Sequence, residues 1–238
     1  MSKKAKVAAI AGGTVACMAA VVGTVIAVNT LLDSKKTEQY TVAEPVHELV
    51  VDSDAGSVRI VATDADRVTV SQTTHWITDE PAPKRTVVDG VLRLADADEC
   101  RGGWTVFRCE TDYVIQVPRD LAVTVKADAG TVKVAGITGN LTIESDAGTV
   151  EGTELGSDRV KASTDAGNVR LGFTTAPSSV DAETDAGNVD IDLPRSEYAL
   201  DLDTDAGDSS VEGIVSYDLA PHTVKAQTDA GNIEIRGR

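Results

Sequence analysis

The sequence predicts an all-β fold, a parallel β-solenoid built from coils of about 20 residues. The triplet Asp-Ala-Gly occurs seven times, and its last six copies follow one another at intervals of 18 to 24 residues. Apolar and polar residues alternate on both sides of the triplet. Only 3% of the residues are aromatic, which favours a narrow interior between two close-packed sheets over a roomy barrel. In such repeats, each unit buries its apolar face against its neighbours.

Each repeat contains two short strands, one on either side of the Asp-Ala-Gly corner. Around Asp165, for example, Val160 and Ala162 precede the corner and Val169 and Leu171 follow it. Apolar residues two positions apart describe a strand with one buried face. A second corner returns the chain, so we expect the strands of successive coils to pair about 4.8 Å apart. The copy at Asp205 departs from the pattern, because its second strand is delayed.

The corner residues have predicted structural roles. Glycine at the third position accepts a positive φ without steric cost, and aspartate at the first position can accept hydrogen bonds from backbone N–H groups of the turn. The predicted turn residues are Asp54, Gly56, Asp128, Gly130, Asp146, Gly148, Asp165, Gly167, Asp185, Gly187, Asp205, Gly207, Asp229 and Gly231.

Stacking the coils places the aspartates in a ladder, where neighbouring carboxylates repel by ~1 kcal/mol in water. Hydrogen bonds to charged groups, at about 1.5–3 kcal/mol each, can offset that repulsion. Calcium is the alternative solution, because it takes six to eight oxygen ligands. The calcium-binding β-roll has a Gly-Gly-x-Gly-x-Asp nonapeptide, however, and this repeat is twice as long with one carboxylate per corner. We therefore predict structural aspartates, with no metal site and no cofactor.

The N-terminal segment has the pattern of a membrane anchor. Residues 1–6 include three lysines, and residues 7–32 carry no charge, which is long enough for a helix to cross a bilayer. We expect a cytoplasmic stub over 1–6, a single transmembrane helix over 7–32 and a polar tether over 33–45. The repeat domain, 46–238, then lies outside the cell. The alternative is a cleaved signal peptide, whose apolar region usually spans only about 7–15 residues.

Residues 71–120 interrupt the repeat and are predicted to cap the first end of the solenoid. They are either degenerate coils or a meander packed over that end. Trp76 and Trp104 lie in this segment and are expected to fill its core. Cys100 and Cys109 also lie here, and an even pair of cysteines in an exported domain predicts a disulfide.

Charge and motifs exclude several classes of function. Without residues 1–36, which hold five basic and one acidic residue, the chain has 17 basic against 37 acidic residues, a net charge of −20. Nucleic acid is excluded as a partner, because phosphates require a basic surface. His47, His75 and His222 show no metal-ligand spacing, and there is no Gly-x-Ser-x-Gly motif or phosphate-binding loop. We predict no catalytic residues and no enzymatic activity.

The Thr/Ser-Asp-Ala-Gly-Asn/Thr-Val repeats, the apolar N-terminal segment and the Val117-Pro118 step resemble a bacterial family. Its members are repeat-containing domains of unknown function labelled "putative adhesin", common in actinobacterial envelopes. The resemblance covers about residues 46–238. It implies a parallel β-solenoid on the extracytoplasmic side of the membrane, and it carries over no catalytic or ligand-binding residues.

The sequence thus predicts a single-pass membrane protein that presents a non-enzymatic, adhesin-like β-solenoid. Its expected partners are the membrane and an envelope protein or glycan whose identity the sequence leaves open. One alternative is an enzyme acting on a cell-envelope glycan, for which carboxylates are plentiful. Another is a regulatory partner of a membrane signalling system, which is compatible with the anchor.

Overall fold

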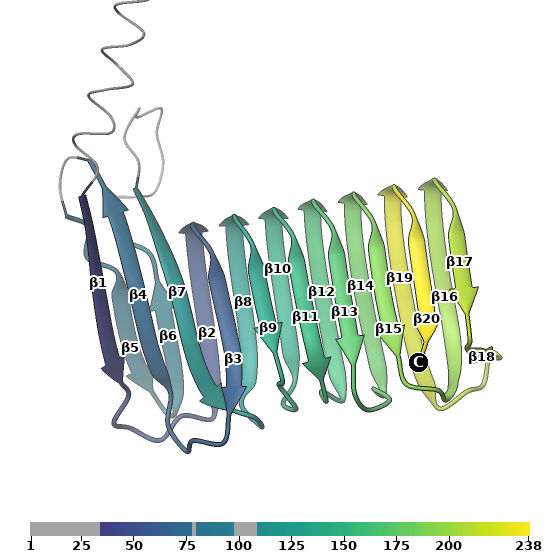
Figure 1. The fold of residues 1–238 in the computed structure, drawn as a ribbon, viewed down its shortest axis with the longest axis horizontal. Coiled ribbons are helices and arrows are strands. Elements are labelled where there is room, and N and C mark those ends of the chain that lie inside the picture. Colours follow the sequence, from purple (N-terminus) through teal and green to yellow (C-terminus); the bar gives the residue numbers. More distant parts are fainter. Residues whose placement is uncertain (1–33, 78–79, 98–108) are drawn as a thin grey trace, which may run out of the picture.

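A computed structural model describes residues 34–77, 80–97 and 109–238. They form two sheets of ten strands each (Figure 1). The sheets lie face to face, and tight corners join the end of a strand in one sheet to the start of a strand in the other. The predicted anchor over 7–32 lies outside these residues. Within them, no helix is long and apolar enough to cross a membrane.

The strands of the described residues are, in chain order, β1 (Ser34–Thr41), β2 (Glu48–Ala55), β3 (Val58–Thr63), β4 (Thr69–Trp76), β5 (Lys84–Val88), β6 (Val91–Ala95), β7 (Cys109–Pro118), β8 (Ala122–Ala129), β9 (Val132–Ala135), β10 (Leu141–Ala147), β11 (Val150–Leu155), β12 (Arg159–Ala166), β13 (Val169–Phe173), β14 (Ser179–Ala186), β15 (Val189–Leu193), β16 (Glu197–Ala206), β17 (Ser209–Glu212), β18 (Val215–Ser216), β19 (His222–Ala230) and β20 (Ile233–Gly237).

The predicted all-β architecture with parallel strands is confirmed in the regular part of the stack. Strands β8, β10, β12 and β14 pair in parallel in one sheet, and β9, β11, β13 and β15 do so in the other. The predicted apolar positions face inward: Val180 and Ala182 before the corner, and Val189 and Ile191 after it, are fully buried. Alternation along each strand and stacking between coils together produce one continuous core.

The coils do not stack in chain order at the C-terminal end. Strand β19 lies between β14 and β16, and β20 lies between β15 and β17 (Figure 1). After β15 the chain therefore skips one place in the stack, forms the coil of β16 and β17, turns through β18 and returns to fill the vacant place. The irregular Asp205 coil, not the last coil in sequence, is the end of the solenoid. This corrects the expectation that sequential coils are neighbours throughout.

The N-terminal end is interleaved in the same way. Strands β6 and β7 pair in parallel with β2 and β3, on the side away from β8 and β9. Strands β4 and β5 are antiparallel additions outside β7 and β6. In and beside residues 71–120, β6 and β7 thus form a coil next to the β2–β3 coil, and β4 and β5 extend the two sheets outside it.

Residues 34–41, predicted to belong to a polar tether, form the edge strand β1. It pairs antiparallel with β4 along its whole length. Its side chains are exposed except for Tyr40, because the strand has one neighbour and covers no core. A strand that buries no face shows no alternation of apolar and polar residues, so the sequence pattern did not reveal it.

Buried aromatic side chains mark the two ends of the stack. Tyr113 of β7 and Tyr198 of β16 are the largest fully buried side chains. Each phenol finds an acceptor: Tyr113 donates to Asp96 Oδ1 at 3.0 Å, and Tyr198 donates to the Pro194 carbonyl at 2.9 Å. Trp76 is only half-buried at the end of β4, and Trp104 lies outside the described residues.

Candidate functional site

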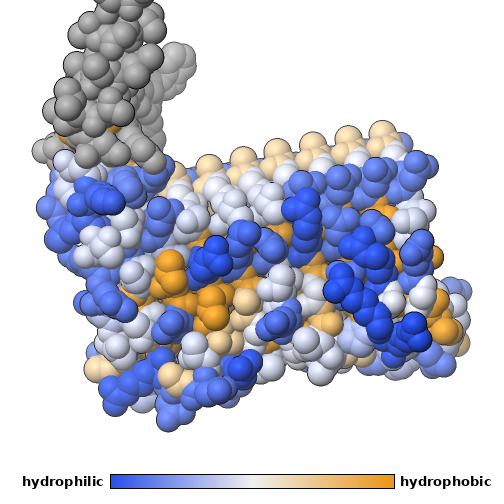
Figure 2. Space-filling view, viewed as in Figure 1, coloured by the Kyte–Doolittle hydropathy of each residue, from blue (hydrophilic) through white to orange (hydrophobic). Residues whose placement is uncertain are grey.

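The Asp-Ala-Gly corners form a ridge along one edge of the stack, seen in Figure 2 as a regular row of side chains. Every predicted corner glycine has a positive φ, from 121° at Gly56 to 157° at Gly231. The glycines also stack on one another. A Cβ added at Gly187 would lie 1.7 Å from the carbonyl oxygen of Gly167 in the neighbouring coil. Glycine is therefore required here both for its conformation and for the close approach of two backbones.

Threonine and asparagine link the corners of neighbouring coils. Thr184 Oγ1 donates to the Gly167 carbonyl, and Thr228 Oγ1 donates to the Gly187 carbonyl, both at 3.0 Å. After the glycines, the backbone N–H of Asn188 donates to the side-chain oxygen of Asn168 at 2.9 Å. Sequence analysis missed these two columns, although the repeated Thr-Asp-Ala-Gly-Asn string contains them.

Two central corner aspartates, Asp165 and Asp185, lack the side-chain hydrogen bonds expected of them within the described residues. From Asp128 onward the corner aspartates are exposed, and these two also make no ion pair within the described part of the chain. One carboxylate per coil also leaves the ridge without a set of converging ligands. Where residues are described, only His75, Glu110 and Asp112 bring three possible metal ligands together.

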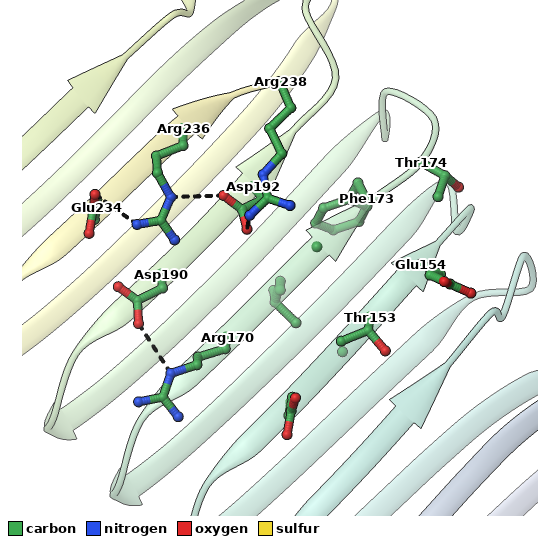
Figure 3. Close-up of a pocket in the computed structure, with 14 residues that line it drawn as sticks. Thr153, Glu154, Arg170, Phe173, Thr174, Asp190, Asp192, Glu234, Arg236 and Arg238 are labelled. Atoms are coloured by element: carbon green, nitrogen blue, oxygen red, sulfur yellow. Dashed lines mark hydrogen bonds and ion pairs between the residues drawn. The ribbon is translucent and has the colours of Figure 1, made fainter.

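A hollow of about 640 Å³ lies on the outer face of one sheet, across β11, β13, β15 and β20 (Figure 3). It forms where Thr153, with a short side chain, and Gly172, with none, lie between residues with longer side chains. Strand β11 bulges at this point, because its register with β13 shifts between Gly152 and Leu155, and Glu154 within the bulge has a φ of 53°.

Two arginines in the hollow form ion pairs with its carboxylates. Arg170 Nε lies 3.4 Å from Asp190 Oδ2. Arg236 lies 2.9 Å from Asp192 and 2.7 Å from Glu234, and hydrogen bonds to these two carboxylates raise its pKa. The described residues that line the hollow include no His, Cys, Ser or Lys. The hollow can form hydrogen bonds with a polar ligand, and two of its carboxylates, Asp190 and Asp192, are paired with arginines.

A buried carboxyl group lies deeper, at the N-terminal end. Asp96 is 2% exposed and follows Leu92 and Leu94 at the next inward position. Its Oδ2 accepts hydrogen bonds from Ser53 Oγ at 3.2 Å and from the Asp54 N–H at 2.9 Å, and its Oδ1 accepts the Tyr113 hydroxyl. Burial raises the pKa of Asp96 despite these donors. Because the chain's own donors occupy both oxygens, we assign Asp96 a structural role.

The C-terminal end of the stack is uncovered. We call it the open end, and it consists of β16, β17, β18 and the loop before β19. Here Val211, Val215, Tyr217 and Leu219 are exposed by 41%, 60%, 43% and 91%. Figure 2 shows hydrophobic colour at this end. At the N-terminal end, by contrast, the two sheets continue through β4 and β1 and through β5.

The structure describes only one of the two cysteines in the predicted disulfide. Cys109, at the start of β7, is disulfide-bonded. Cys100 lies outside the described residues, so the Cys100–Cys109 pairing remains a prediction.

The fold and its corners can now be compared with known proteins. The profile of the Toastrack DUF4097 family matches residues 46–237. The chain belongs to the Toastrack DUF4097 family. A search of curated proteins found no significant match. The actinobacterial setting implied by the sequence resemblance remains a prediction.

Solved structures are similar to this Toastrack domain at low sequence identity. A crystal structure of a "putative cell adhesion protein" from Clostridium sporogenes aligns with a TM-score of 0.51 and 15% identity, covering 86% of this chain and all of the other. A "putative adhesin" from Bacteroides fragilis aligns with a TM-score of 0.47 and 12% identity, covering 86% and 97%. The Clostridium sporogenes structure supports the fold alone.

Proposed function

We propose that this Toastrack domain is a non-enzymatic, adhesin-like interaction module, held outside the cell by a single membrane anchor over residues 7–32. The observation that carries the proposal is the contrast between the two ends of the stack. Among the described residues, four of the six exposed large apolar side chains belong to the open end, whereas β1, β4 and β5 at the N-terminal end contribute one, Val88. Exposed apolar clusters rimmed by polar residues are typical of protein interaction sites.

The open end also has the backbone of a docking site. Strand β17 is the last strand of its sheet in the described part of the chain, where β20 is its only strand partner. Edge strands of this kind can pair with an extended segment of another protein. Asp208, Glu212 and Asp218 lie close to these apolar residues in sequence, and Glu197 accepts a hydrogen bond from the Tyr217 hydroxyl. A partner with basic and apolar residues on an exposed strand fits this chemistry best.

An envelope glycan hydrolase is the less supported function. Its reaction requires one carboxyl group as an acid and a second as a base or nucleophile. In the hollow of Figure 3, Asp190 and Asp192 of β15 are instead engaged by Arg170 of β13 and Arg236 of β20.

Capture from native envelopes tests the interaction. We expect the outer domain to retain a specific protein or glycan, with or without calcium, and Leu219→Asp or Val215→Asp to abolish retention. Val88→Asp is the matched control, because Val88 is also 62% exposed but lies at the opposite end. Equal capture by all variants would exclude the open end as the binding surface. Turnover of a glycan by the purified domain would replace the proposal with the enzymatic alternative.

Protease treatment of intact protoplasts tests the anchor independently. We expect the repeat domain to be digested while the N-terminal residues remain protected in the membrane. Release of the intact domain into the medium would indicate a cleaved signal peptide, and full protection would place the domain inside the cell.

A further inference from the structure

The His75 side chain meets two carboxylates that are distant from it in sequence, Glu110 and Asp112, on the outer face of the sheet near its N-terminal end. The antiparallel register of β4 and β7 places His75 opposite Glu110 and Thr73 opposite Asp112. The imidazole and the two carboxylates therefore share one face, and one ligand atom from each lies within 4.8 Å of the others. All three residues are half-buried.

The Asp112 carboxylate is held by Ser57, in the corner that precedes β3. Its Oδ1 accepts hydrogen bonds from the Ser57 backbone N–H at 2.8 Å and from Ser57 Oγ at 2.7 Å. Its Oδ2 lies 3.8 Å from His75 Nε2, too far for a hydrogen bond. Carboxylates that bind a metal ion are usually oriented by hydrogen bonds of this kind. Here the donors hold one oxygen of Asp112, and the other oxygen lies near the imidazole.

The His75 ring has no such hydrogen bond of its own. Its Nδ1 is buried and makes no hydrogen bond to the described residues, and Nε2 stops short of Asp112. An ion bonded at about 2.0–2.2 Å to an imidazole nitrogen and to carboxylate oxygens holds those atoms about 3–4 Å apart. The spacing of His75 and Asp112 already falls in that range.

We propose that His75, Glu110 and Asp112 bind a divalent transition-metal ion, with Zn²⁺ as the best fit. An imidazole nitrogen favours Zn²⁺ and its neighbours in the first transition series, whereas Ca²⁺ and Mg²⁺ prefer oxygen-only sites. Three protein ligands leave a fourth position for water. Lys35, the register partner of His75 on β1, is exposed and can turn its ammonium group to solvent.

The ion would join strands that the chain connects only through a long path. His75 and Glu110 are 35 residues apart in sequence, and Asp112 is tied to Ser57 just before β3. Binding would thus fasten β4 to β7 and β7 to the first regular coil. Because the unfolded chain does not hold these ligands together, binding favours the folded state. This inference is independent of the proposed interaction at the open end.

Calorimetric titration of the tag-free, full-length chain in detergent micelles tests the site. We expect one Zn²⁺ per chain, a higher unfolding temperature with Zn²⁺, and no such effect with Ca²⁺ or Mg²⁺. His75→Gln and Glu110→Gln should weaken Zn²⁺ binding at least 100-fold, and Ser57→Ala should weaken it about tenfold through the orientation of Asp112. His47→Gln is the matched control, since it removes an exposed histidine elsewhere.

Cobalt provides a readout that does not depend on the folding of a variant. Co²⁺ bound to the wild type should show the visible d–d absorption of a four-coordinate site with an imidazole ligand, and Zn²⁺ should displace it. Absence of one-to-one binding by the wild type would overturn the proposal. So would Zn²⁺ binding that His75→Gln leaves unchanged, because the ion would then be held by the acidic surface.

Discussion

The corner glycines set how closely the coils approach. At Gly187 the space that a side chain needs is already filled by the backbone of the next coil. The aspartate two positions earlier points to solvent instead. Within one conspicuous triplet, the glycine therefore determines the packing, and the aspartate contributes charge and solubility.

Two glycine substitutions should change stability in opposite directions. Gly187→Ala should lower the free energy of unfolding by about 2–5 kcal/mol, because left-handed strain and overpacking add. Gly172→Ala should be neutral or stabilise by about 0.5–1 kcal/mol, because glycine weakens a strand and a Cβ there meets nothing closer than 3.8 Å. Urea unfolding measures both. Similar effects at the two positions would contradict the stacking of corner glycines.

The buried Asp96 should make stability depend on pH. Burial raises the pKa of this carboxyl, so the folded state holds its proton more tightly than the unfolded chain. Its contribution is fully present below the unfolded pKa, about 3.9, and is lost as the pH rises through the folded pKa. Relative to Asp96→Asn, the wild type should therefore become less stable as the pH rises above about 4. Urea unfolding across pH measures this difference. A difference that grows in favour of the wild type would mean that the donors outweigh burial.

At the scale of the element, the strands are held by columns of like residues. Thr164, Thr184 and Thr228 occupy one buried column before the corner, and each donates to a glycine carbonyl of the adjacent coil. The asparagines after the corner form a second column that follows the order of coils in space, since Asn188 accepts from Asn232. These hydrogen bonds join separate coils, so they reinforce the stack rather than the individual turn.

Adjacent substitutions should separate the buried column from the exposed ridge. Thr164→Val should destabilise by about 1 kcal/mol, because the hydroxyl is 2% exposed and its hydrogen bond to Gly148 is lost. Asp165→Asn, one residue later, should change stability by less than about 0.5 kcal/mol, or raise it slightly by reducing repulsion. Thermal melts with calcium and with a chelator measure both effects. A calcium-dependent loss in Asp165→Asn would restore the aspartates as metal ligands.

At the scale of the whole molecule, the chain interleaves its coils at both ends. The β2–β3 coil lies inside the β6–β7 coil, and the β19–β20 coil lies inside the β16–β17 coil. Neither of these two inner coils can detach without separating two neighbours. A simple solenoid can fray from its last repeat, whereas here the C-terminal coil is paired on both sides.

Deleting two coils from the C-terminal end should therefore destabilise the domain less than deleting one. Ending the chain after Ser216 removes only the last coil but leaves β16 and β17 without their neighbour. Ending it after Ser196 removes both coils and leaves the regular β14–β15 coil as the end. We expect the longer deletion to be the more stable variant, as measured by the cooperativity and midpoint of urea unfolding. A more stable shorter deletion would indicate coils stacked in chain order.

The sequence by itself determined the repeat, the two strands per coil, the inward positions and the glycine corners. These are local properties, because alternation and turn chemistry are encoded within a single repeat of about 20 residues. The inward position of Asp96 could also have been predicted, because it continues the alternation that begins with Leu92 and Leu94. Strand β1 was not, because it buries no face.

Only the tertiary structure decided which coil neighbours which. Coils of nearly identical pattern can pair in any order, so the spacing of Asp205 and Asp229 signals an irregularity without revealing that the second coil lies inside the first. For the same reason, nothing local brings His75 to Glu110 and Asp112. That meeting depends on the antiparallel pairing of two strands separated by the rest of the cap. The open end likewise follows from the order of coils, because its apolar side chains are exposed where no further coil packs against them.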